Sequence, residues 1–188
     1  MKVAVYSETK DEWERIGNNI EYTKTVNGPY PKRREYYTLS FTHIFEFDND
    51  IVWFAYSYPY TYSKLKELLR EAVLTKNAVK TTLCKTIAGY NFNCLTITSN
   101  ESRKKKGVVL TARVHPGETV GSWMMHGAID FLVSDNPTAK ELRDNYVFKV
   151  IPMLNPDGVI QGNYRTSLMG CDLNRRYLGT SKVSYVKS

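Results

Sequence analysis

The sequence predicts an α/β protein in which an N-terminal antiparallel β piece precedes a mixed-sheet α/β domain. Residues 36–47 carry apolar or aromatic side chains at nearly every second position, which is the period of a strand with one buried face. Residues 63–73 follow the spacing of an amphipathic helix instead. Apolar runs at 108–114 and 147–153 flank a helical stretch, and this order is typical of a parallel crossover.

The first part of the chain is expected to be a partial N-terminal β domain, residues 1–57. Asp48-Asn49-Asp50 is a turn signal, and the apolar run at 51–56 follows it. We therefore expect an antiparallel hairpin over residues 36–57. Tyr58-Pro59-Tyr60 marks the boundary to a second domain, residues 58–188.

The second domain is expected to begin with a helix that Ser63 caps. Its buried face would hold Leu65, Leu68, Leu69, Ala72 and Val73. Strands are predicted at 81–87, 92–98, 108–114 and 147–153, the last two buried on both faces. A helix is predicted from Thr119 to Ser134, with Val120, Trp123, Met124, Gly127, Ala128, Phe131 and Leu132 on its apolar face, and a short one from Asn136-Pro137 to Arg143. Asn155-Pro156-Asp157-Gly158 reads as a turn and 159–188 as a loop.

Composition limits the class of protein. Among 188 residues, 42% are hydrophobic and 24% are charged, which is ordinary for a folded soluble domain. No apolar run is long enough to span a bilayer, and the first residues do not form a secretory signal. Three widely spaced cysteines do not make a disulfide framework. We therefore expect a cytoplasmic protein that does not contact membranes.

The charge is unevenly distributed. The chain carries a net charge of +7, and residues 58–188 hold 19 basic and 10 acidic side chains. Such a surplus suits an acidic partner, although a solvated basic face explains it equally well. The run Arg103-Lys104-Lys105-Lys106 is most simply an exposed loop. Nucleic acid is an unlikely partner, because no aromatic residues are interleaved with basic ones on a sheet face.

The strongest chemical signal follows the strand at 108–114. His115 and Glu118 stand there, three residues apart, and ligands gather outside the carboxyl ends of parallel strands. Imidazole nitrogen and carboxylate oxygen are both zinc ligands. Taken alone, the pair is as well explained by a glutamate near a helix start beside a loop histidine.

A second polar cluster comes after the next parallel strand. Arg165, Asn174 and Arg175 lie in this glycine-punctuated stretch, and the strand before it should end at the same rim. Two guanidinium groups and an amide suit an anionic substrate, because arginine binds a carboxylate with two hydrogen bonds. A surface salt bridge is the alternative for any one of these arginines.

Four short motifs in this order resemble the zinc metallocarboxypeptidase family, and more narrowly its cytosolic carboxypeptidase subfamily. They are His115-Pro116-Gly117-Glu118, Asn155-Pro156-Asp157-Gly158, Asn163-Tyr164-Arg165 and Asp172-Leu173-Asn174-Arg175. The aromatic stretch at 54–63 also resembles that subfamily, where a β domain meets the peptidase domain. The resemblance implies a hydrolase that removes C-terminal residues, glutamate above all, from acidic protein tails such as those of polyglutamylated tubulin.

The resemblance also implies roles for individual residues. His115 and Glu118 match two zinc ligands, and Arg165 matches the catalytic arginine that polarises the scissile carbonyl. Asn174 and Arg175 match the pair that binds the terminal carboxylate of the substrate. The family's third ligand and its general base lie further along than Ser188. We therefore expect the chain alone to bind zinc poorly and to be inactive. The alternative is a pseudoenzyme, a non-catalytic module that binds C-terminal tails.

Overall fold

The computed structural model describes residues 2–25, 36–100, 104–177 and 186–187, and the chain divides into two compact units. The first unit comprises residues 1–59 and the second residues 60–188. The division falls inside the Tyr58-Pro59-Tyr60 segment.

The first unit consists of two small antiparallel sheets. β1 (Val3–Ser7) lies between β2 (Glu12–Ile16) and β5 (Val52–Ala55), whereas β3 (Asn18–Lys24) pairs with β4 (Tyr37–Thr42). The predicted hairpin over 36–57 is wrong, because β4 and β5 have different partners.

Asp50 explains why β5 pairs with β1. Its carboxylate accepts hydrogen bonds from the Ser7 hydroxyl at 2.6 Å and the Thr9 amide at 3.0 Å. These bonds fix the residues that precede β5 to the end of β1. The alternating pattern survives only in part, because Leu39 and Phe41 are half-buried while Phe45 is exposed.

The second unit is built on one mixed sheet with the order β10-β6-β7-β9-β8. The strands are β6 (Ala78–Thr86), β7 (Asn91–Ile97), β8 (Lys106–Thr111), β9 (Tyr146–Ile151) and β10 (Val186–Lys187). β8 and β9 are parallel, and the other pairs are antiparallel. The predicted mixed sheet and its parallel crossover are therefore confirmed.

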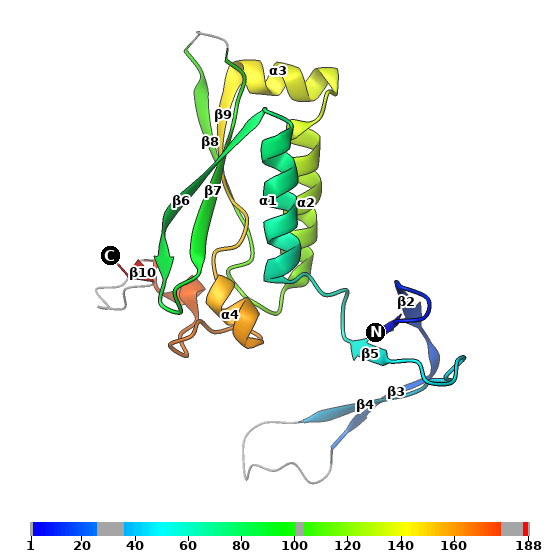
Figure 1. Cartoon of the computed structure of the whole chain (residues 1–188). Helices are drawn as coiled ribbons and strands as arrows, with labels where there is room; N and C mark the ends of the chain where they lie inside the picture. The colour runs from blue at the N-terminus through cyan, green and yellow to red at the C-terminus, as the bar shows by residue number, and fades with distance from the viewer. Residues whose placement is uncertain (1, 26–35, 101–103, 178–185, 188) are drawn as a thin grey trace. The chain divides into compact units, whose positions relative to one another are not determined.

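Two helices, α1 (Tyr62–Leu74) and α2 (Thr119–Val133), lie side by side along one face of this sheet (Figure 1). They bury Leu65, Leu68, Leu69, Met125, Ile129 and Leu132 against Leu95, Ile97 and Val150 of the sheet. Thr61, not Ser63, caps α1, because the Thr61 hydroxyl accepts a hydrogen bond from the Lys64 amide. Val73 is exposed rather than buried.

Helix α2 has nearly the predicted bounds, but its buried face was predicted only in part: Leu132 is buried as expected, whereas other predicted members are not. Val120 and Met124 are 63% and 72% exposed, and the face that is buried holds Ser122, Met125, Ile129, Leu132 and Val133. The helix is apolar on most sides, so periodicity does not select a face. The buried Arg113 guanidinium donates a hydrogen bond to the Ser122 hydroxyl at 2.8 Å, and this bond fixes the first turns of α2.

The prediction that β8 is buried on both faces is also wrong. Val109 of β8 and Val79 of β6 are 68% and 65% exposed. Among the described residues, helices α1 and α2 cover only the opposite face of the sheet (Figure 1). A continuous apolar run therefore did not distinguish a strand covered on both faces from one covered on a single face.

Three further segments complete the unit. α3 (Pro137–Asn145) begins after Asn136, as predicted. The expected turn at 155–158 is instead the start of α4 (Pro156–Gln161), where the Asn155 side chain caps the Gly158 amide. A short 3₁₀ helix, η1, spans Leu173–Arg175.

The basic run is not simply an exposed loop. Arg103 lies outside the described residues, but the Lys105 ammonium donates hydrogen bonds to the Ser99 carbonyl at 2.6 Å and the Arg143 carbonyl at 2.9 Å. Lys106 already belongs to β8. All three cysteines are free thiols. Among the helices of the described part of the chain, none is long and apolar enough to cross a membrane.

Candidate metal and substrate site

The carboxyl ends of the parallel strands β8 and β9 meet at one rim, as the sequence predicts. Backbone bonds continue past both strands, from the Ala112 amide to the Ile151 carbonyl and from the Leu154 amide to the Ala112 carbonyl. The Asn155 side-chain amide also donates to the Val114 carbonyl at 3.3 Å. The loop that carries His115 is therefore fixed to the segment that follows β9.

Arg113 fixes this loop through hydrogen bonds of its buried guanidinium. It is only 6% exposed and has a left-handed φ of +57°, which is uncommon outside glycine. Its guanidinium donates to the Pro116 carbonyl at 2.7 Å and to the Tyr60 carbonyl at 3.2 Å, besides the Ser122 hydroxyl. A buried cation with several carbonyl and hydroxyl acceptors is well satisfied. Arg113 therefore fixes both the start of the loop and the first turns of α2.

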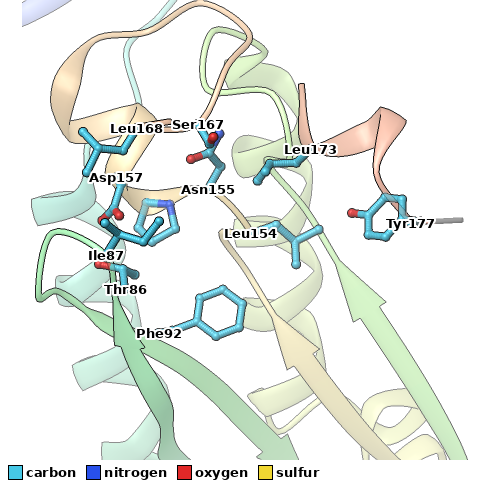
Figure 2. Close-up of a pocket in the computed structure, with 11 residues that line it drawn as sticks. Thr86, Ile87, Phe92, Leu154, Asn155, Asp157, Ser167, Leu168, Leu173 and Tyr177 are labelled. Carbon is cyan, nitrogen blue, oxygen red and sulfur yellow. The ribbon is translucent and has the colours of Figure 1, made fainter. Parts of the chain in front are cut away.

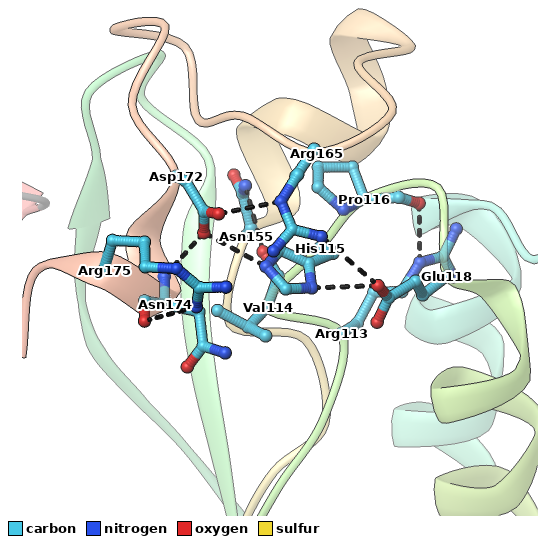
Figure 3. Close-up of polar contacts among 10 residues, drawn as sticks. All are labelled: Arg113, Val114, His115, Pro116, Glu118, Asn155, Arg165, Asp172, Asn174 and Arg175. Atoms are coloured by element: carbon cyan, nitrogen blue, oxygen red, sulfur yellow. Dashed lines mark hydrogen bonds and ion pairs between the residues drawn. The ribbon is translucent and has the colours of Figure 1, made fainter.

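Gly117 brings a second loop against the first. Its amide donates to the Tyr164 carbonyl at 2.6 Å, and a Cβ on residue 117 would lie 2.7 Å from that carbonyl oxygen. Only glycine allows this approach. As a result, Arg165, which follows Tyr164, lies beside the pair His115 and Glu118 (Figure 3).

His115 and Glu118 converge as predicted. His115 is 6% exposed, and its Nδ1 lies 3.0 Å from Glu118 Oε1. Two donors on one tetrahedral zinc, with bonds of about 2.1 Å, would lie about 3.4 Å apart. The observed separation is close to that value, so the two side chains fit two corners of a zinc site.

Asp172 supplies an independent argument for a cation at this point. Its Oδ1 lies 3.0 Å from His115 Nε2, the same distance as that from Nδ1 to Glu118 Oε1. A neutral imidazole has one proton for these two carboxylates, and we consider the form in which Nε2 carries it and donates to Asp172. Nδ1 then presents a lone pair to the Glu118 oxygen. Two electron-rich atoms at this distance need a proton or a metal ion between them. A histidine held by a carboxylate through its other nitrogen is the usual arrangement of a zinc ligand.

Arg165 joins the same network. Its Nε donates to Asp172 Oδ2 at 2.7 Å, and one of its terminal nitrogens lies 3.9 Å from Glu118 Oε1. Burial by itself would raise the pKa of Asp172, but hydrogen bonds from His115, Arg165 and the Asn174 amide outweigh it and leave that pKa below its usual value. Asp172 is therefore held as a carboxylate.

Asn174 and Arg175 lie at the same rim, on η1. The Asn174 amide donates to Asp172 Oδ1 at 3.0 Å, and the Arg175 guanidinium donates to the Asn174 carbonyl. Both side chains are exposed. The structure thus brings together all five residues singled out from the sequence, with Asp172 as the link between the two loops (Figure 3).

Sequence reasoning assigned no role to Asp172 or Arg113. Asp172 stands within a quoted motif, so a signal for it existed, whereas nothing in the sequence distinguishes Arg113 from a surface arginine. Within the described residues, no group of three His, Cys, Asp or Glu side chains is arranged to hold a metal ion.

Comparison with known proteins identifies the family of the chain. Residues 55–185 match the model of the zinc carboxypeptidase family. The chain therefore belongs to the zinc carboxypeptidase family, whose cofactor is zinc.

Several similar curated proteins are cytosolic carboxypeptidases. The chain is 48% identical to cytosolic carboxypeptidase 2 of Xenopus tropicalis over 185 residues, covering 92% of this chain and 19% of that protein. It is 48% identical to cytosolic carboxypeptidase 3 of Bos taurus, with 92% and 18% covered, and 43% identical to human cytosolic carboxypeptidase 1, with 90% and 16% covered. The chain thus spans about a fifth of the length of these relatives.

Solved structures give the same fold. A metallo-carboxypeptidase from Burkholderia cenocepacia superposes with a TM-score of 0.76 at 28% identity, over 96% of this chain and 45% of that one. A metallo-carboxypeptidase from Pseudomonas aeruginosa shares the fold with a TM-score of 0.72 at 22% identity, over 96% and 44%. The expected carboxypeptidase-like α/β fold is confirmed.

Proposed function

We propose that this chain forms part of the active site of a cytoplasmic zinc carboxypeptidase that removes C-terminal glutamate from acidic protein tails. The observation that carries the proposal is the bridge between His115 Nδ1 and Glu118 Oε1, with Asp172 holding the other imidazole nitrogen. Membership of the family and the names of the relatives support the reaction class.

His115 and Glu118 would hold zinc through Nδ1 and a carboxylate oxygen. Zinc, when bound, supplies Lewis-acid polarisation of a carbonyl and makes water a stronger acid. With its proton on Nε2 and donated to Asp172, His115 would present Nδ1 as a ligand. The side chains present thus fit part of the zinc site.

Arg165 and the η1 residues would act on the substrate. Arg165 is half-buried and held by Asp172, so its position is fixed before substrate arrives. A fixed cation beside a developing oxyanion stabilises the transition state by several kcal/mol. The exposed Asn174 and Arg175 would bind the free terminal carboxylate, which restricts cleavage to the C-terminus.

The charge of the second unit supports an acidic substrate. Residues 58–188 hold nine more basic than acidic side chains, which attracts acidic peptides from solution. Polyglutamylated tubulin tails have this chemistry, so we propose them as the partner.

The test uses the protein expressed from its natural gene and a synthetic peptide ending in several glutamates. We expect release of free glutamate, and the loss of that release in His115→Ala and Glu118→Gln. Arg165→Ala should mainly lower kcat. Glu141→Gln, an exposed glutamate on α3, is the matched control for Glu118.

Recognition of the terminal carboxylate has its own control. Arg175→Ala should raise KM for the free peptide, while Arg176→Ala, the adjacent exposed arginine, should leave KM unchanged. A C-terminally amidated peptide should not be cleaved. Tight binding of the peptide without any glutamate release would instead support the non-catalytic tail-binding module and refute the hydrolase.

A further inference from the structure

Two features outside the candidate site could receive a ligand. One is a cavity of about 200 Å³ in the second unit, beside Phe92 and Leu154 (Figure 2). Its lining is mostly apolar, and its side chains alone do not define a ligand. The other is a row of three aromatic rings in the first unit, where ring geometry and charge together define one.

The aromatic row consists of Trp13, Tyr6 and Trp53, on the neighbouring strands β2, β1 and β5. The strand register places Tyr6 directly opposite Trp13 on one side and Trp53 on the other, so all three side chains stand on the same face of the sheet. Ring centroids are 5.4 Å apart for Tyr6 and Trp13, and 5.6 Å apart for Tyr6 and Trp53. Trp53 is 44% exposed, and the other two are half-buried. The row therefore presents flat apolar surface to the solvent.

Carboxylates gather at one side of this row. The exposed Asp11 accepts a hydrogen bond from the Tyr6 hydroxyl at 2.6 Å. The pKa of Tyr6 is raised, first by this hydrogen bond, and then by burial and by the charges of Asp11, Glu8 and Asp50. The potential beside the aromatic row is therefore negative on the side of Glu8 and Asp11.

The nearest basic side chains do not cancel this potential. Lys10 is already paired with Glu14 at 3.2 Å and with Glu46 at 2.8 Å. Arg15 lies opposite Ala4 in the register, on the other side of the row from Glu8. Residues 1–57 hold nine acidic and seven basic side chains in total. A basic ligand therefore suits the aromatic row, whereas a phosphate-bearing one does not.

We propose that the aromatic row binds a proline-rich peptide segment in the polyproline II conformation, with a basic side chain of that segment beside Glu8 and Asp11. Surfaces lined by aromatic rings recognise this conformation, which is already formed before binding. It has no internal hydrogen bonds, so its carbonyl groups can accept from the indole N–H groups of Trp13 and Trp53.

The dimensions of the aromatic row agree with such a ligand. A polyproline II helix rises about 3.1 Å per residue, so every second residue recurs after about 6.2 Å along its axis. The ring spacings of 5.4 and 5.6 Å are close to this repeat, so successive contacts of the peptide can meet successive rings. The site goes beyond the proposed peptidase function and does not depend on zinc.

The test uses the protein expressed from its natural gene and fluorescein-labelled peptides with an amidated C-terminus, so that carboxypeptidase action does not shorten them. The first peptide is an oligoproline with a terminal arginine, the second has glutamate in place of that arginine, and the third keeps the arginine on a flexible glycine-serine chain. By fluorescence anisotropy, the arginine oligoproline should bind about fivefold more tightly than the glutamate one, with a smaller difference at high salt. The glycine-serine peptide should not bind measurably, because it lacks rings and must be ordered on binding.

Variants locate the site. Trp13→Ala and Trp53→Ala should each weaken binding of the arginine oligoproline about tenfold. Tyr22→Ala is the matched control, because Tyr22 is a 69% exposed aromatic residue on β3 of the same unit, and it should change nothing.

Charge variants test the orientation of the peptide. Glu8→Gln combined with Asp11→Asn should remove the preference for arginine over glutamate, while Glu21→Gln, at an exposed position on β3, should keep it. If the tryptophan variants do not fold, this loss of preference decides the question.

Four results would overturn the proposal: no binding of the arginine oligoproline, equal binding of the glycine-serine peptide, binding that the tryptophan and charge variants all leave unchanged, or tighter binding of oligothymidine than of any peptide. Because no peptide is hydrolysed in this experiment, its failure is separate from failure of the peptidase proposal.

Discussion

Gly117→Ala tests whether the close approach of two loops assembles the site. The added Cβ would lie 2.7 Å from the Tyr164 carbonyl oxygen, whereas ordinary contacts begin near 3.4 Å. The loops must separate by several tenths of an ångström and lose the 2.6 Å bond between them. Such overpacking costs about 1–3 kcal/mol, and the lost hydrogen bond adds about 1 kcal/mol. We expect the free energy of unfolding to fall by about 2–4 kcal/mol.

The assay is urea denaturation followed by far-ultraviolet circular dichroism. Among the described residues all α-helices lie in the second unit, so the helical signal reports on that unit. Gly127→Ala is the matched control, because its Cβ meets nothing within 4 Å and the position is exposed inside α2. It should stabilise the unit by about 0.5–1 kcal/mol. If Gly117→Ala is as stable as wild type, the loops are not held by this contact.

Three other perturbations have expected outcomes. In the protein expressed from its natural gene, Asp172→Asn should weaken zinc binding about 10–100-fold by isothermal titration, whereas an unchanged affinity would remove Asp172 from the site. Arg113→Met should lower the free energy of unfolding by about 3 kcal/mol or more, because it leaves the buried Tyr60 and Pro116 carbonyls without this donor; equal stability in urea would contradict this. Burial, with Asp130 nearby, raises the pKa of Tyr60 to about 12, so its folded form keeps the proton longer than its unfolded form. Stability should therefore be complete below pH 10 and fall by at most about 3 kcal/mol as the pH rises to about 12. Tyr60→Phe should remove this part of the alkaline loss, and an identical pH profile would refute it.

Sequence patterns predicted the positions of helices and strands in this protein better than they predicted which strands pair with each other. The bounds of α2 and the parallel pairing of β8 with β9 follow from apolar spacing, because one helix between two strands allows few arrangements. The pairing of β5 with β1 does not follow from such spacing. It depends on Asp50 reaching Ser7, a contact between residues 43 positions apart that no local period encodes.

The same limit explains the errors about faces. A helix such as α2, apolar on most sides, can turn either side to the sheet at a similar hydrophobic gain. The hydrogen bond from Arg113 to Ser122 distinguishes the two orientations, because the other orientation would leave a buried cation without this acceptor. The buried polar contact therefore determines which side of α2 faces the sheet, which the apolar pattern alone does not determine.

The candidate site depends both on the local spacing of residues and on a contact between residues far apart in the sequence. His115 and Glu118 could be found from the sequence because they are only three positions apart and directly follow a predicted parallel strand. Their chemistry depends on Asp172, which is 57 positions away from His115. Without that carboxylate, the imidazole proton could sit on Nδ1 and satisfy Glu118 directly, and the pair would be a simple hydrogen bond. With it, the proton of a neutral imidazole has an acceptor at Nε2, and in that form the gap between Nδ1 and Glu118 is a place for a cation.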